Sequence, residues 1–134
     1  MGMKAAEPCP CGRLGPGRQR LTFGACCGRY LAGVAAPDAE ALMRSRYTAF
    51  VLADEAYLLA TWHSSARPGT AGPAAGAKWL GLEVREHRPG ATDDRAEVEF
   101  VARYRVGGKA VRLHERSRFV REQGRWYYLD GDLH

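Results

Sequence analysis

The chain has 134 residues and a formal net charge of +5 at pH 7. This length suits one ordinary domain, and a hydrophobic content of 46% excludes a disordered protein. No apolar run is long enough to cross a bilayer, and residues 1–12 lack the apolar segment of a secretory signal. We therefore expect a globular protein of the cytoplasm with no membrane-bound segment.

The positive charge is concentrated near the amino terminus. Residues 1–36 hold five basic residues and one acidic residue, whereas the rest of the chain holds fifteen basic and fourteen acidic residues. The same segment contains all four cysteines. Four thiolates around one divalent cation carry a net negative charge, which nearby basic residues would neutralise. We therefore interpret much of the basic character as compensation for a metal site rather than as a nucleic-acid-binding surface.

The cysteines form a C-x-C pair, Cys9 and Cys11, and an adjacent pair, Cys26 and Cys27. A disulfide within either pair would close a strained ring, and persistent disulfides are unusual in the cytoplasm. Zn²⁺ binds four thiolates tetrahedrally, and four protein ligands leave no position for an activated water. The pattern favours structural zinc, with free or redox-active thiols, disulfides and an iron–sulfur cluster as alternatives.

Two stretches, CPCG at 9–12 and CCG at 26–28, resemble the halves of the SEC-C motif, a zinc-binding knuckle first recognised at the carboxyl end of the protein-export ATPase SecA. The chain departs from the motif at residues 13–15, where RLG replaces the usual Gly-Ser-Gly. The 14 residues between the halves also exceed the usual number, with an extra loop at 15–17. We expect the glycines beside the ligands (Gly12, Gly24 and Gly28) to adopt positive φ and to direct N–H groups at sulfur.

Two helices are predicted after this segment. Residues 37–53 form the first, with Pro37 suited to its first position and acidic residues in its first turn. Apolar residues recur there at spacings of three and four, and Arg46 falls inside the resulting stripe. The stripe comprises Ala39, Leu42, Met43, Tyr47 and Phe50. Residues 54–62 form the second helix, with Asp54 as its cap.

The second half of the chain predicts a loop followed by strands. Residues 66–77 are nearly all Ala, Gly and Pro, which predicts the loop. Strand patterns then cover 79–88, 96–106, 109–121 and 125–130. The last two links, Gly107-Gly108 and Gln123-Gly124, are short enough for antiparallel hairpins. Two helices before a meander predict an α+β fold, with the helices on one face of a curved sheet.

Several stretches resemble the YchJ family of uncharacterised bacterial proteins: LMRSRYTAF, YLLATWH, WLGLEV and ERSRFVREQGRWYYLDG. The resemblance runs from Cys9 to Gly131. It implies a SEC-C zinc knuckle joined to a domain of the nuclear transport factor 2-like (NTF2-like) fold, a cone with a cavity. We therefore expect the knuckle over residues 1–36 and the conical domain over 37–134, with two or three helices on about four strands.

The third predicted strand places a carboxylate among apolar residues. Val111, Leu113, Glu115, Ser117 and Phe119 share one face of it. If that face meets the helices, Glu115 lies inside the cone, and Arg46 is its natural partner. We interpret the two as a structural ion pair, because an unpaired buried charge is costly. The alternative is that Glu115 is an acid, a base or a ligand anchor.

Two histidines are further candidates for a functional role. His63 follows Trp62 at a helix end, where it can satisfy terminal carbonyls. His114 shares the outer face of its strand with arginines. Neither has a Cys or Ser partner at a spacing that would suggest a catalytic pair, so we prefer a structural role to a catalytic one for both.

The outer face of the sheet carries a row of arginines on the third strand, Arg112, Arg116 and Arg118. Arg103 and Arg105 on the neighbouring strand can extend it, and Glu97 and Glu99 dilute its charge. A solvated sheet face explains the row without a function. Weak contact with RNA or the ribosome is the alternative.

Two functional hypotheses follow from the sequence. The first is a non-enzymatic adaptor, in which the zinc knuckle presents basic and small residues to a protein partner, as the resemblance to the SecA tail suggests. The second is a small-molecule-binding protein or a lyase- or isomerase-like enzyme that uses the cavity. Its candidate catalytic residues are Glu115, Arg46 and His63. The fold by itself does not choose between them.

Overall fold

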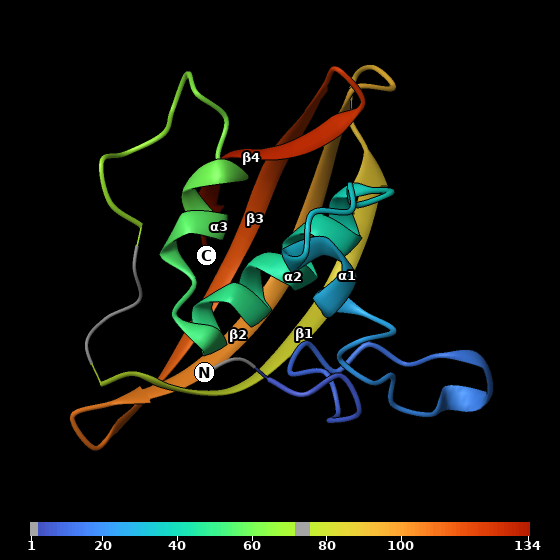
Figure 1. The fold of residues 1–134 in the computed structure, drawn as a ribbon. Coiled ribbons are helices and arrows are strands. Elements are labelled where there is room, and N and C mark those ends of the chain that lie inside the picture. The colour runs from blue at the N-terminus through green and yellow to red at the C-terminus, as the bar shows by residue number, and fades with distance from the viewer. Residues whose placement is uncertain (1–2, 72–75) are drawn as a thin grey trace.

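The computed structural model describes residues 3–71 and 76–134 and shows helices on one face of a curved sheet (Figure 1). The elements in chain order are η1 Pro16–Arg18, α1 Cys27–Leu31, α2 Ala39–Leu52, α3 Glu55–Ala60, β1 Lys78–Pro89, β2 Arg95–Val106, β3 Lys109–Glu122 and β4 Arg125–Leu133. The predicted α+β architecture is confirmed. Each of the four strands runs one to three residues longer than predicted.

The sheet is an antiparallel meander in the order β1-β2-β3-β4. Two-residue turns at Gly107-Gly108 and Gln123-Gly124 join the last three strands, and all four turn residues have φ between 52° and 78°. Paired positive φ values are typical of type I′ turns, whose twist matches that of the strands. Both predicted hairpins are therefore confirmed. Register shifts in β1 and between β3 and β4 add to the bending of the sheet.

Helix α2 begins two residues later than its predicted start at residue 37. Asp38 has extended backbone, and its carboxylate accepts a hydrogen bond of 2.8 Å from the N–H of Ala41. Asp38 is therefore the N-cap, and Pro37 precedes the helix instead of occupying its first position. The predicted apolar stripe is confirmed, because four of its five side chains are buried and Phe50 is half-buried.

Helix α3 has the predicted cap, with the N–H of Tyr57 donating to the Asp54 carboxylate over 3.0 Å. The helix is shorter than the predicted 54–62 because the chain leaves it to join the sheet. The N–H of His63 donates to the carbonyl of Tyr128, and the N–H of Tyr128 donates to the carbonyl of Thr61, each over 2.8 Å. These bonds attach the helical pair to β4.

One hydrophobic core lies between the helices and the sheet. Its buried members include Leu42 on α2, Val98 on β2 and Phe119 on β3. All four cysteines belong to the same cluster, so the amino-terminal segment packs directly against the rest of the chain. The division after residue 36 remains a prediction about sequence organisation.

The predicted loop over 66–77 lies partly outside the described residues. Residues 66–71 and 76–77 contain no helix or strand, as expected. Residues 72–75 are not described.

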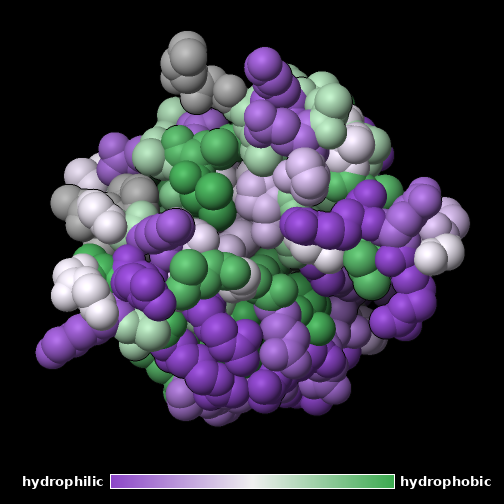
Figure 2. Space-filling view, turned by 90° about the horizontal axis from the view of Figure 1, so that it is seen from below, coloured by the Kyte–Doolittle hydropathy of each residue, from purple (hydrophilic) through white to green (hydrophobic). Residues whose placement is uncertain are grey.

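Hydrophobic side chains are scattered over the exposed surface. Seen from below, hydrophobic patches alternate with hydrophilic side chains (Figure 2). The exposed large hydrophobic residues are Leu14, Val34, Val51, Leu80 and Leu133. Within 3–71 and 76–134, no helix combines the length and the apolar character that a bilayer span needs.

Replacing Asp38 with Ala is expected to lower the free energy of unfolding by about 1 kcal/mol, because the Ala41 N–H loses its acceptor. Urea denaturation followed by circular dichroism measures the change. The control is Asp93→Ala at an exposed turn residue, which should change stability by less than about 0.5 kcal/mol. Equal effects of the two substitutions would contradict the capping role.

Candidate metal centre and interior cavity

Four buried thiols converge on one point in the amino-terminal segment. Cys9, Cys11, Cys26 and Cys27 are 0–3% exposed, and their sulfur atoms all lie within 4.8 Å of one another. The Sγ atoms of Cys11 and Cys26 are 3.6 Å apart, and all four thiols are free. Tetrahedral ligands at about 2.3 Å from a zinc ion lie roughly 3.8 Å from one another. The donor set and its spacing therefore fit a metal ion, as predicted for these four residues.

The backbone around the thiols is shaped by glycines, although not all in the way predicted. Gly12 has φ of 74° and closes a turn by donating its N–H to the Cys9 carbonyl over 3.2 Å. Gly24 and Gly28 do not have positive φ, and for them that prediction is wrong. They are needed for close approach instead, because a Cβ at Gly28 would lie 2.7 Å from the carbonyl oxygen of Phe23.

Three arginines hold the carbonyls of the cysteines. Arg20 donates to the carbonyl of Cys9 over 3.1 Å, and Arg29 donates to that of Cys26 over 3.1 Å. Arg44 of α2 donates to the carbonyl of Cys11 over 3.0 Å. Two of these arginines belong to the basic surplus of residues 1–36. The third, which sequence reasoning missed, comes from the next helix and links it to the thiol cluster.

The thiols compete for protons when no cation is present. Hydrogen bonding with Cys11 lowers the pKa of Cys26 to about 7. Hydrogen bonding with Cys11 also raises the pKa of Cys27, and burial adds to this effect. Part of the cluster therefore keeps its protons at neutral pH. A divalent cation would allow all four sulfur atoms to ionise together.

A cavity of about 340 Å³ lies inside the cone, between α2 and the sheet. Its wall is mainly aromatic and apolar, and the polar side chains among its described residues, apart from tyrosine and tryptophan, are Arg46, Glu115 and Ser117. The aromatic members are Tyr47, Phe50, Trp62, Trp79, Phe100, Tyr104, Phe119 and Tyr128. Glu115 therefore faces the interior, as the strand pattern predicts, and the cone is not filled by its own side chains.

Arg46 and Glu115 do not form the predicted ion pair. Among the residues that the structure describes, Arg46 has no carboxylate within ion-pair distance. Its Nη1 donates to the Leu58 carbonyl over 2.8 Å and to the Thr61 hydroxyl over 2.7 Å. The end of α3 leaves the Leu58 carbonyl without a helical N–H donor, and this carbonyl and the Thr61 hydroxyl hold the guanidinium away from Glu115.

Tyr128 separates the two charges. The guanidinium carbon of Arg46 lies 4.7 Å from the centre of the Tyr128 ring and 5.3 Å from that of Trp62. The Tyr128 hydroxyl donates to Oε2 of Glu115 over 3.0 Å, and Ser117 donates to the same oxygen over 2.6 Å. Burial lowers the pKa of Arg46 to about 10, which leaves it charged at neutral pH.

His63 has partners that its sequence context did not suggest. Its Nδ1 lies 2.7 Å from the Ser65 hydroxyl and accepts from the Ser65 N–H, and its Nε2 lies 2.8 Å from the Glu122 carboxylate. The ring contacts that the structure describes are therefore with Ser65 and Glu122, and not with the helix-terminal carbonyls that we expected His63 to satisfy. A reverse turn brings Ser65 back onto the ring, and Glu122 arrives from the end of β3, 59 positions later in the chain.

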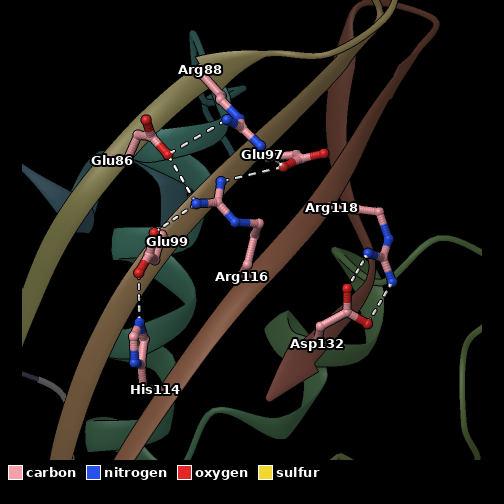
Figure 3. A network of polar contacts seen from close by, with 8 residues as sticks. All are labelled: Glu86, Arg88, Glu97, Glu99, His114, Arg116, Arg118 and Asp132. Carbon is pink, nitrogen blue, oxygen red and sulfur yellow. Dashed lines mark hydrogen bonds and ion pairs between the residues drawn. The ribbon is translucent and has the colours of Figure 1, made fainter. Parts of the chain in front are cut away.

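Two arginines of the row on the outer face, Arg116 and Arg118, are paired with carboxylates from neighbouring strands (Figure 3). Arg116 contacts Glu86, Glu97 and Glu99 at 3.0, 3.3 and 2.7 Å. Arg118 contacts Asp130 and Asp132, and His114 lies 2.6 Å from Glu99. The hydrogen bond with His114 lowers the pKa of Glu99. The predicted dilution of the row by Glu97 and Glu99 is thus confirmed at Arg116. Arg103, Arg105 and Arg112 are exposed, and among the described residues none of them has a carboxylate within ion-pair distance, so contact of this end of the row with a phosphate backbone stays untested.

A family model described as the middle NTF2-like domain of YchJ matches residues 38–131. The chain belongs to the YchJ family. A UPF0225 protein of Polaromonas sp. strain JS666 is 64% identical to this chain. The match covers 92% of this chain and 91% of the Polaromonas protein. A UPF0225 protein of Xanthomonas oryzae is 55% identical over 92% and 93% of the two chains.

Solved structures support the same assignment for this YchJ-family chain. A SEC-C motif containing protein from Rhodopseudomonas palustris superposes with a TM-score of 0.80 at 35% identity and covers 94% of this chain and 98% of its own. A SEC-C motif containing protein from Psychrobacter arcticus superposes with a TM-score of 0.79 at 31% identity, and the match covers 94% of this chain and 82% of that protein's chain. The predicted NTF2-like fold with an amino-terminal SEC-C segment is confirmed.

The Glu115 carboxylate in this YchJ-family protein requires a glycine opposite it. A Cβ at Gly131 would collide with that carboxylate, and moving the carboxylate aside would break its hydrogen bonds with Ser117 and Tyr128, so Gly131→Ala is expected to lower the free energy of unfolding by about 1–3 kcal/mol. Gly81→Ala is the control, because its Cβ meets nothing within 4 Å. Chemical denaturation measures both. The cost of Gly131→Ala should fall in a Glu115→Ala background, and an unchanged cost there would refute the explanation.

Proposed function

We propose that Cys9, Cys11, Cys26 and Cys27 bind one structural Zn²⁺. The convergence of four buried thiols carries this proposal, because soft donors at this spacing suit zinc and fill its coordination shell. Bound zinc would cross-link two short segments that have little regular structure, since α1 has only five residues and η1 three. The ion would supply folding energy rather than an activated water.

We further propose that the chain is a non-enzymatic adaptor whose cysteine segment contacts a protein partner. The projecting loop, residues 13–20, supports this. It extends away from the sheet and is closed by a hydrogen bond of 2.7 Å from the Gly15 N–H to the Gln19 carbonyl (Figure 1). Leu14 is 46% exposed on it, and Arg18 is exposed beside it. An apolar side chain next to positive charge suits an acidic protein surface with an apolar centre.

A second candidate function is the binding of a small molecule in the cavity. The open volume of about 340 Å³ is the observation that favours it, together with an aromatic wall and few polar groups. Binding is better supported than lyase or isomerase chemistry. Glu115 is the one carboxylate among the described lining residues, and Ser117 and Tyr128 already donate to it.

The zinc proposal predicts that Cys11→Ser lowers bound zinc well below one equivalent and destabilises the fold, because one of four ligands is lost. Elemental analysis of freshly purified protein and thermal unfolding measure the two effects. Thr48→Val is the matched control, since it removes a hydroxyl 3.8 Å from the Cys9 sulfur without removing a ligand. It should retain zinc. Wild-type protein without metal would refute the proposal.

The adaptor proposal predicts that the projecting loop is needed for partner binding. Affinity capture from the native cytoplasm, followed by reconstitution with the purified partner, compares the wild type with Leu14→Ser and Arg18→Glu. Each substitution should weaken binding about tenfold or more, which is the effect of losing a hot-spot contact. Leu133→Ser, at an exposed leucine on β4, is the control and should bind normally. Equal binding by all four proteins would refute the role of the loop.

A further inference from the structure

The guanidinium of Arg46 is buried without an anionic partner. The side chain is 6% exposed and forms part of the cavity wall. Its Nη1 is occupied by the Leu58 carbonyl and the Thr61 hydroxyl. Within the described part of the chain, neither Nε nor Nη2 has a hydrogen-bond acceptor. A buried cation is costly unless it is paired, so three N–H donors remain for a partner from outside the chain.

The cavity wall has more hydrogen-bond donors than free acceptors. The indole N–H groups of Trp62 and Trp79 are buried and, among the described residues, also lack acceptors. Glu115 does not compensate, because its Oε2 is held by Ser117 and Tyr128, and among the described residues no hydrogen bond or ion pair joins its carboxylate to the Arg46 guanidinium. The missing partner is therefore an acceptor, and a carboxylate is the acceptor that a guanidinium binds most strongly.

The aromatic side chains around Arg46 restrict how a ligand can approach. Trp62 and Tyr128 lie against the guanidinium, with ring centres 5.3 and 4.7 Å from its central carbon. The free N–H groups lie along the edge of the guanidinium, where a carboxylate can bind through both oxygens. The rest of the wall, including Phe50, Phe100 and Phe119, offers apolar contact to the body of the ligand.

We infer that the cavity binds a small organic monocarboxylate with an apolar or aromatic body, whose carboxylate pairs with Arg46. This inference rests on the proposed small-molecule-binding function. Glu115 lies in the same wall, so it would repel a second negative charge on the ligand. Selection of one carboxylate over two is therefore built into the cavity.

The first test uses the full-length wild-type protein and two probes of matched shape, 4-phenylbutanoate and 4-phenylbutanamide. Trp62 and Trp79 line the cavity, so tryptophan fluorescence reports occupancy, and calorimetry gives the affinities. The carboxylate should bind about tenfold more tightly than the amide, as expected for a charge-assisted hydrogen-bonded pair.

The second test changes the two charges separately. Arg46→Met should reduce binding of 4-phenylbutanoate to the level of the amide, about tenfold. Glu115→Gln should tighten binding of the carboxylate, because it removes a like charge. Arg112→Met on β3 is the control, since this side chain is exposed and does not line the cavity. Thermal unfolding and metal content verify that each variant is folded.

The outcomes separate this inference from the function on which it rests. Equal binding of both probes to the wild type would overturn the carboxylate preference and leave a ligand-binding cavity in place. Binding of neither probe would overturn both. Should Arg46→Met fail to fold, the comparison of the two probes on the wild type and the Glu115→Gln variant still test the carboxylate preference. Weaker binding of 4-phenylbutanoate by Glu115→Gln than by the wild type would also overturn the inference.

Discussion

The convergence of four buried thiols is the constraint on which the amino-terminal part of the molecule depends. This part has one five-residue α-helix and a short 3-10 turn, too little regular structure to order it by backbone hydrogen bonds alone. Small units of this kind need cross-links or contact with a larger core. Here the four thiols lie close enough together to hold one cation, and three arginine side chains hold the carbonyls of Cys9, Cys11 and Cys26.

Helix α2 joins the thiol cluster to the cavity. Arg44 and Thr48, four residues apart, lie on the side facing the cysteines. Met43, Arg46 and Tyr47 lie on the side facing the cavity. The periodicity of an α-helix makes this division, because residues three or four apart share a face. A rigid element therefore has the candidate metal centre on one side and the candidate ligand site on the other.

Much of the fold could be predicted from the sequence because it depends on local pattern. The apolar stripe of α2, the cap at Asp54 and both two-residue hairpins follow from spacing and turn chemistry over a few residues. The cysteine pattern likewise predicted which side chains would meet, since four thiols in a short segment have few other uses. The start of α2 was misplaced because proline and aspartate both favour a helix start, and only the geometry shows which of them caps it.

The sequence by itself determined the α+β architecture, the order of the strands and the identity of the four thiols. Tertiary structure alone decided the partners of the charged and polar side chains. Leu58 and Thr61 hold Arg46 away from Glu115, and Glu122 reaches His63 from the end of β3. These pairings depend on how α3 ends against β4 and on the register of the strands. No periodicity along the chain predicts these pairings, because they join segments that only the folded structure brings together.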